Sequence, residues 1–241
     1  MRKLDFLIAG VQKGGTTALH GFLSRHPGLF LPAAKELHFF DNEQVNWEAP
    51  DYSTLHSHFI GRHEHQLAGE VTPIYIYWRE SMGRIHAYNP DIKIVLLLRD
   101  PVERAYSHWL MEVTRKKEIM SFGQAIREGR ERNSSQHRVF SYVERGFYSK
   151  QIQRILSHFP REQVLFLKTE DLREKHARTL NSLCAFLGVD AFDTMPLGAY
   201  VNVRRSHAAP MDEVDRAYLA DLFWDDIKRT EQMTGLSLAC Q

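Results

Sequence analysis

Short apolar runs recur along the chain, and helical patterns or turns separate them. The runs lie at residues 6–9, 29–31, 94–98 and 164–167. Runs of this length without polar alternation are typical of strands buried on both faces of a parallel sheet. The pattern therefore predicts an α/β fold with a central parallel sheet.

Apolar residues at helical spacing fill the segments between these runs. We expect helices over residues 19–23, 52–59, 74–86, 152–159, 180–187 and 211–233. Gly188 follows the pattern 180–187 directly and Gly235 comes two residues after the last pattern, as glycine does where a helix ends. No internal repeat or linker interrupts this order, so a single domain is the simplest prediction.

The first apolar run leads into the glycine-rich sequence GVQKGGTT at residues 10–17, and a helical pattern follows it. A strand, a glycine-rich turn and a helix N-terminus together form an anion site. Backbone N–H groups converge there, the helix dipole adds positive potential, and glycine lets a phosphate approach the backbone closely. We predict that this loop binds phosphate; a tight glycine turn with a solvated lysine is the alternative.

The spacing within this loop differs from that of a nucleotide triphosphatase loop, G-x-x-x-x-G-K-[ST]. Gly10, Gly15 and Thr17 keep the glycine and hydroxyl positions, but Thr16 stands where the lysine belongs. The lysine lies inside the loop as Lys13. The loop therefore fits a donor with one 5′-phosphate and a further anionic group better than it fits Mg·ATP.

Residues 35–41, KELHFFD, alternate in a way that predicts a strand with Glu36, His38 and Phe40 on one side. A glutamate and a histidine on one face can reach the same ligand. That arrangement suits removal of a proton from a hydroxyl group, with the histidine orienting or sharing the proton. A polar edge strand with a solvated glutamate is the alternative.

Arg99 follows the apolar run at residues 94–98 directly, so it lies at the carboxyl end of a central strand. Open α/β sheets bind ligands at that edge, and an arginine fork suits a phosphate. Asp100 and Pro101 predict the start of a helix, which carries Ser107 about two turns further on. A salt bridge to a nearby carboxylate is the alternative role for Arg99.

The composition is that of an ordinary globular protein: 241 residues, 43% apolar, 25% charged, with a formal net charge of +1. That charge argues against a protein that coats nucleic acid but permits a local basic pocket. Cys184 and Cys240 give no disulfide framework, and Cys184 falls in an apolar helical pattern. His56, His58, His63 and His65 are interpreted as a solvated histidine-rich face, with a metal site as the alternative.

The first apolar run is too short for a signal peptide, and no segment approaches the ~20 apolar residues of a membrane span. From these features we expect a cytoplasmic protein without a membrane span.

Three motifs in this order resemble the PAPS-dependent sulfotransferases, where PAPS is 3′-phosphoadenosine 5′-phosphosulfate. The motifs are QKGGTTAL at residues 12–19, KELHFF at residues 35–40 and LRDPVERAYS at residues 98–107. The chain is most similar to the branch of heparan sulfate sulfotransferases and their bacterial relatives, which include sulfotransferase domains of polyketide pathways. The resemblance extends over residues 4–207.

The resemblance implies a P-loop-like three-layer α/β sandwich in which helices flank a central parallel sheet. It implies that the 5′-phosphosulfate is bound by Lys13, Gly14, Gly15, Thr16 and Thr17. It places Arg99 and Ser107 at the 3′-phosphate, an aromatic, Tyr148, near the nucleotide, and Arg204 and Arg205 in a covering basic loop. Glu36 matches the family's general base, and His38 matches its neighbouring histidine.

By the same resemblance, the chain transfers a sulfuryl group from PAPS to an acceptor hydroxyl and releases 3′-phosphoadenosine 5′-phosphate (PAP), and the scheme requires no metal. Heparan-type enzymes carry a lysine in an E-K-T-P-like motif, where this chain has Val71. The acceptor therefore stays open among glycan, lipid, polyketide and small-molecule hydroxyls. A P-loop kinase or other phosphotransferase and a non-catalytic PAP-binding module are the alternative functions.

Overall fold

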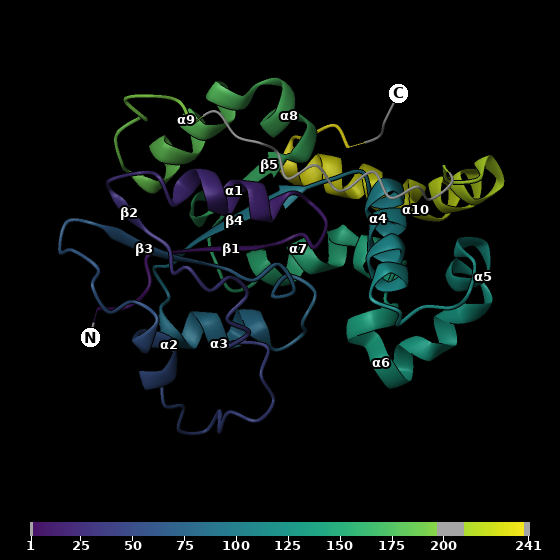
Figure 1. Ribbon diagram of the computed structural model, residues 1–241, viewed down its shortest axis with the longest axis horizontal. Helices are drawn as coiled ribbons and strands as arrows, with labels where there is room; N and C mark the ends of the chain where they lie inside the picture. Colours follow the sequence, from purple (N-terminus) through teal and green to yellow (C-terminus); the bar gives the residue numbers. More distant parts are fainter. Residues whose placement is uncertain (1, 197–209, 239–241) are drawn as a thin grey trace. The chain divides into compact units, whose positions relative to one another are not determined.

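The computed structural model describes residues 2–196 and 210–238, which pack as two compact units (Figure 1). The first unit contains the chain up to Leu98 and the segment that begins at Gln153. The second contains Arg99–Ile152 and the C-terminal described segment. The single-domain organisation expected from the sequence stays a prediction.

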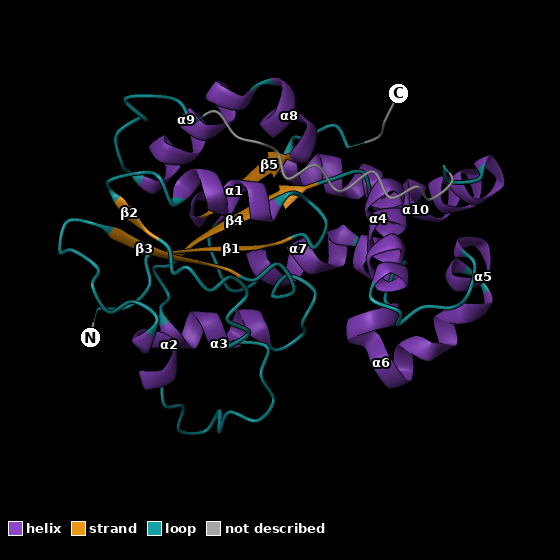
Figure 2. Ribbon diagram, viewed as in Figure 1, coloured by secondary structure: helices purple, strands orange, loops and turns teal. Residues whose placement is uncertain are grey.

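Within the described residues, the first unit is built on a five-stranded sheet in the order β2-β3-β1-β4-β5 (Figure 2). All of its pairings are parallel. The strands are β1 (Phe6–Gly10), β2 (Leu29–Phe30), β3 (Leu67–Val71), β4 (Lys93–Leu98) and β5 (Val164–Lys168). The predicted parallel sheet and its four apolar runs are therefore confirmed, and β1 lies at the centre.

Helices cover both faces of this sheet (Figure 1). On one face lie α1 (Thr16–Leu23), α8 (Thr169–Glu174) and α9 (His176–Leu187); on the other lie α2 (Ser53–Ser57) and α3 (Ser81–Tyr88). Phe6 and Ile8 of β1 belong to the apolar core that α1, α8 and α9 close, because alternate residues of a strand share a face. Cys184 is buried on α9, as expected. The three-layer α/β sandwich is confirmed.

The second unit is helical. It contains α4 (Pro101–Thr114), α5 (Phe122–Ile126), α6 (Asn133–Phe140) and α10 (Glu213–Thr234), with short 3₁₀ turns at Glu128–Arg132 and Glu144–Gly146. Helix α7 (Tyr148–Leu156) continues from this unit into the first, where a 3₁₀ turn (Arg161–Gln163) precedes β5. An ion pair of 2.5 Å joins Arg127 to Asp215 of α10, and Phe147 packs edge-on against Phe223. These contacts fasten α10 to the rest of the unit.

Two local predictions are wrong. Residues 35–41 form no strand, because only Glu36 N–H bonds to a strand carbonyl, Val71 O, while the N–H groups of residues 37–40 bond to side-chain oxygens of Glu70, Thr72 and Tyr75. The helix expected from residue 74 begins only at Ser81, after a series of turns in which Tyr77 N–H bonds to Ile74 O.

Gly69 provides a test of the packing at the centre of the sheet. It lies opposite Phe6 in the β1–β3 register, and a Cβ there would lie 2.0 Å from the Phe6 ring. We expect Gly69→Ala to lower the free energy of unfolding by ~1–3 kcal/mol, the usual cost of overpacking a core. Urea unfolding measures the change.

Gly21 supplies the matched control, because it lies on the exposed side of α1 and a Cβ added there would meet nothing within 4 Å. Gly21→Ala should raise the free energy of unfolding by ~0.5–1 kcal/mol through helix propensity. Equal effects of the two substitutions would contradict the packing account.

Candidate active site

The glycine-rich loop begins where β1 ends and is held by the backbone of β4. Val11 N–H donates to Leu97 O over 3.1 Å, and Gly14 N–H donates to Val11 O over 2.9 Å. A Cβ on Gly14 would lie 2.4 Å from Leu97 O, so only glycine fits this close approach. Gly15 is the N-cap of α1 and has a left-handed φ of 91°.

The start of α1 has the features of an anion site. Its N-cap residue, Gly15, has no side chain that accepts from the first turn, so the N–H groups of that turn can serve a ligand. Thr16 is buried, Thr17 is exposed and Lys13 is half-buried within the loop. Thr17 and Lys13 are therefore at least partly open to solvent beside these N–H groups.

Thr169, the first residue of α8, fixes the loop from the side of β5, and no pattern in the sequence pointed to this contact. Its hydroxyl lies 2.7 Å from Gly14 O and 2.9 Å from Leu98 O. The hydroxyl can donate to either carbonyl, so it joins the glycine-rich loop to the end of β4.

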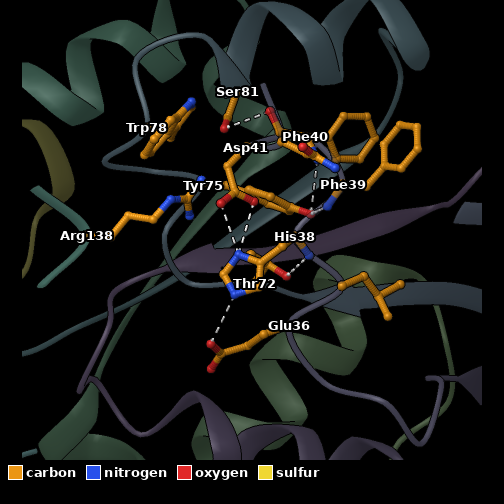
Figure 3. A network of polar contacts seen from close by, with 12 residues as sticks. Glu36, His38, Phe39, Phe40, Asp41, Thr72, Tyr75, Trp78, Ser81 and Arg138 are labelled. Atoms are coloured by element: carbon orange, nitrogen blue, oxygen red, sulfur yellow. Dashed lines mark hydrogen bonds and ion pairs between the residues drawn. The ribbon is translucent and has the colours of Figure 1, made fainter. Parts of the chain in front are cut away.

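Glu36 and His38 come together although their segment is not a strand (Figure 3). His38 Nε2 lies 3.7 Å from Glu36 Oε2, and both side chains are more than two-fifths exposed. On its other side, His38 Nδ1 lies 3.0 Å from Asp41 Oδ2, and Asp41 is completely buried. A carboxylate acceptor on Nδ1 places the ring proton there and leaves Nε2 facing Glu36.

Lys35 approaches the second oxygen of the same glutamate. Its Nζ lies 2.5 Å from Glu36 Oε1, and its side chain is 17% exposed. Glu36 is therefore held between an ammonium group and an imidazole ring that Asp41 orients. A carboxylate in this setting, still partly open to solvent, can accept a proton from an incoming hydroxyl group.

Three buried side chains support this loop, and the sequence did not reveal this role or the contact of Asp41 with His38. Glu70 Oε1 accepts from Leu37 N–H over 3.1 Å and from the Thr72 hydroxyl, and Tyr75 OH accepts from Phe39 N–H over 3.1 Å. Burial raises the pKa of Glu70 to about 7, although hydrogen bonds from Thr72, Leu37 and Tyr75 act in the opposite direction. The sequence signal that could have indicated this role is the position of Glu70 near the end of a buried strand.

In the second unit, the structure joins two of the predicted nucleotide residues. The Tyr148 hydroxyl donates to Arg99 O over 3.0 Å, and Tyr148 is buried. Asp100 caps α4 by accepting from Val102 N–H over 2.7 Å, so the backbone from Arg99 O to the start of α4 is fixed. Ser107 lies on α4 and is 9% exposed.

The Arg99 guanidinium also lies near a carboxylate, as the alternative role of Arg99 in a salt bridge requires. Its Nη2 lies 3.7 Å from Glu103 Oε2, while Glu103 Oε1 accepts from Arg216 over 2.7 Å. Glu103 is therefore shared between two guanidinium groups. The predicted basic residues Arg204 and Arg205 lie outside the described residues.

Over residues 2–196 and 210–238, no group of three or more His, Cys, Asp or Glu side chains is arranged to hold a metal ion. Within the histidine-rich segment, His56 lies 2.9 Å from the Tyr88 hydroxyl, and His63 stacks on His65. No helix in the described part of the chain combines the length and apolar character needed to cross a membrane.

A parallel sheet whose first strand leads through a glycine-rich loop into a helix N-terminus defines a P-loop-like α/β fold. The sequence model of the sulfotransferase domain matches residues 3–202. The chain therefore belongs to the sulfotransferase family, and the resemblance read from its motifs is confirmed.

Among relatives, the mouse heparan sulfate glucosamine 3-O-sulfotransferase 3A1 is 35% identical over 189 residues, which is 76% of this chain and 45% of that protein. The chain spans about half the length of the curated relatives it matches.

Among solved structures, a sulfotransferase from Alicyclobacillus acidocaldarius matches with a TM-score of 0.83 and 27% identity, covering 99% of this chain and 98% of that one. Mouse sulfotransferase SULT7A1, solved with PAP, shares the fold at a TM-score of 0.58 and 14% identity, covering 97% of this chain and 87% of that one.

The buried carboxyl of Glu70 gives stability a specific pH dependence. Because its pKa is raised from 4.5 to about 7, the folded protein keeps this proton while the unfolded chain loses it. The contribution is complete below pH 4.5 and is lost as the pH rises to about 7, a change of ~3 kcal/mol.

We expect the free energy of unfolding of wild type, relative to Glu70→Gln, to fall by ~3 kcal/mol between pH 4.5 and pH 8. Urea unfolding of both proteins across this range measures the difference. Glu48→Gln, at an exposed glutamate, should show no such trend. A difference between wild type and Glu70→Gln that does not vary with pH would remove Glu70 as the titrating group.

Proposed function

We propose that this chain transfers the sulfuryl group of PAPS to an acceptor hydroxyl, with Glu36 as the general base. The observation that carries the proposal is the arrangement of Glu36 against His38, which Asp41 orients, at the edge of the sheet where the glycine-rich loop begins. Strands β1 and β3 are parallel neighbours, so their carboxyl ends lie at one edge. The loop leaves β1 there, and Glu36 N–H donates to Val71 O at the end of β3.

The donor side of this proposal rests on the chemistry of the loop. A phosphosulfate carries negative charge that the N–H groups at the start of α1 and the Lys13 ammonium can bind. Gly14 leaves room for no side chain, which keeps the loop backbone close to β4. In this assignment Gly14, Gly15, Thr16 and Thr17 bind the 5′-phosphosulfate.

In the reaction, Glu36 accepts the acceptor's hydroxyl proton while the acceptor oxygen forms a bond to sulfur. The bond between sulfur and the bridging oxygen of the donor breaks, and both its electrons stay on the PAP phosphate. Lys13 and the loop N–H groups stabilise that developing charge. His38 fixes the orientation of Glu36 and shares the proton through Nε2.

The same proposal assigns the 3′-phosphate to Arg99 and Ser107. Arg99 is the residue directly after β4, and open α/β sheets bind ligands at the carboxyl ends of their strands. Tyr148 holds the Arg99 backbone through its hydroxyl, which supports a place for Tyr148 near the nucleotide. The assignment of Arg204 and Arg205 to a covering loop rests on the family resemblance alone.

A phosphotransferase that uses Mg·ATP is the rival enzyme, and Thr16 in the lysine position of the triphosphatase loop argues against it. A module that binds PAP without chemistry would have no use for Glu36 between Lys35 and His38. Calorimetry with PAP and with Mg·ATP, followed by a turnover assay with labelled PAPS, separates the three functions.

The mouse relative is named as a heparan sulfate glucosamine 3-O-sulfotransferase, but this chain has Val71 where the resemblance to heparan-type enzymes implies a lysine. We therefore propose an acceptor hydroxyl without restricting it to a glycan. A screen of glycan, lipid, polyketide and small-molecule acceptors with labelled PAPS identifies the class.

Glu36→Gln tests the base. It keeps the size of the side chain but cannot accept the proton, so turnover should fall about 100-fold or more while PAP affinity stays within about threefold. Single-turnover kinetics and calorimetry measure the two quantities. Glu48→Gln changes an exposed glutamate further along the chain and should leave both unchanged. Full turnover by Glu36→Gln would eliminate Glu36 as the base.

Arg99→Ala tests the second phosphate contact. Loss of a charged hydrogen bond to phosphate costs about 1.5–3 kcal/mol, so the Kd for PAP should rise about 10- to 100-fold. Adenosine 5′-phosphate, which has no 3′-phosphate, should bind wild type and Arg99→Ala with the same affinity. Arg79→Ala removes the same charge from an exposed position in the first unit and should not change the affinity for PAP. An unchanged Kd for Arg99→Ala would exclude Arg99 from the phosphate site.

A further inference from the structure

The backbone of the loop that carries Glu36 and His38 is bound to one neighbouring segment. Five consecutive N–H groups, those of residues 36–40, all donate to residues 70–75. Glu36 N–H donates to Val71 O, and the acceptors for the next four are side-chain oxygens. Figure 3 shows Thr72 and Tyr75 among these acceptors. These five hydrogen bonds take the place of the backbone ladder that a partner strand would provide.

The side-chain acceptors form a connected and buried set. Leu37 N–H donates to Glu70 Oε1 over 3.1 Å, and His38 N–H lies 3.5 Å from Thr72 Oγ1. Tyr75 OH accepts from both Phe39 N–H and Phe40 N–H, over 3.1 and 3.4 Å.

Glu70, Thr72 and Tyr75 are each no more than 1% exposed, and the Thr72 hydroxyl donates to Glu70. Water therefore does not compete for these acceptors.

The loop needs such support because its backbone is strained. Glu36 has a φ of 62° and His38 a φ of 54°, in the left-handed region that residues other than glycine rarely adopt. Strained residues persist only where the surrounding structure determines their conformation, and they gather at active sites. The strain at Glu36 and His38 falls on the two residues assigned to proton transfer.

We propose that Glu70, Thr72 and Tyr75 are positioning residues that hold Glu36 and His38 in these left-handed conformations through the loop N–H groups. The inference rests on the proposed sulfuryl transfer. These three residues touch no reacting atom in this assignment. They act through the loop backbone, whose conformation directs the Glu36 carboxylate and the His38 ring at each other.

Tyr75 provides the most specific test, because Tyr75→Phe removes only the hydroxyl group. Tyr75→Phe keeps the ring that packs 5.6 Å from Phe40 but deletes the hydroxyl that accepts from Phe39 and Phe40. A displaced base is costly, since a misplacement of about 1 Å can reduce a rate about 100-fold. We expect kcat to fall about 10- to 100-fold, with the KM for PAPS within threefold of wild type.

Tyr88→Phe is the matched control. Tyr88 is also buried, its ring lies 5.4 Å from the same Phe40, and its hydroxyl accepts from a backbone N–H over 2.9 Å. That N–H belongs to Leu4, outside the catalytic loop. Tyr88→Phe should lower stability much as Tyr75→Phe does, but its kcat should stay within threefold of wild type.

A double substitution tests whether Tyr75 acts through Glu36. If it does, Tyr75→Phe in a Glu36→Gln background should reduce kcat by less than a further twofold, since the positioned group is already disabled. If the kcat of the double variant falls by the product of the two single reductions, the proposal is overturned. A kcat of Tyr75→Phe within threefold of wild type, or an equal loss in Tyr88→Phe, would also overturn it.

Amide hydrogen exchange gives a readout that does not need turnover. The N–H groups of residues 36–40 should be protected, and Tyr75→Phe should accelerate exchange at Phe39 and Phe40 more than elsewhere. If wild type fails to transfer sulfuryl groups, the proposed function is wrong, and the exchange data still decide whether these five hydrogen bonds hold the loop. Unprotected amides in an active enzyme would instead overturn the positioning role alone.

A second pair of variants covers the case in which Tyr75→Phe does not fold. Thr72→Val removes the hydroxyl next to His38 N–H, and Thr72→Ser keeps it. Thr72→Val should reduce kcat at least tenfold, and Thr72→Ser should restore it to within threefold of wild type. Equal activity of Thr72→Val and wild type would overturn the proposal.

Discussion

Parallel pairing of β1 with β3 and β4 is the constraint on which the candidate site depends. It brings the carboxyl ends of all three strands to one edge, where β1 continues into the glycine-rich loop and β3 into the segment that holds the loop with Glu36. These two parts of the candidate site therefore leave the sheet at the same edge, although they are far apart in the sequence. The buried apolar strands provide the stability, and the polar connections after them provide the chemistry.

The loop with Glu36 and the loop with Lys13 are held in different ways. Close backbone approach fixes the glycine-rich loop, because Gly14 lies against Leu97 O and leaves no space for a side chain. Buried polar side chains fix the loop with Glu36 by accepting hydrogen bonds from its N–H groups. The first device suits a loop that offers N–H groups to an anion. The second suits a loop that must offer side chains, since its own N–H groups are already satisfied.

The strands could be predicted well from the sequence because β1, β4 and β5 are uninterrupted apolar runs. Strand β3 is missing from the four apolar runs, since Gly69 and Glu70 break its apolar pattern. The proximity of the Glu36 and His38 side chains was predicted correctly, but from a strand that does not form. Their spacing suggests a strand face, but left-handed turns bring them together. Asp41 and Tyr75 were missed because their roles depend on folded contacts, and Tyr75 lies 36 residues from its partner Phe39.

Thr169 has a consequence for anyone who exchanges parts between related enzymes. Its hydroxyl lies between a carbonyl of the glycine-rich loop and one at the end of β4, so three segments from distant parts of the gene meet at a single oxygen. A chimera that takes its first hundred residues from one parent and its remainder from another inherits this junction only if the second parent supplies a hydroxyl there. Crossover points for such hybrids are best chosen with this threonine and its two carbonyl neighbours kept from one parent.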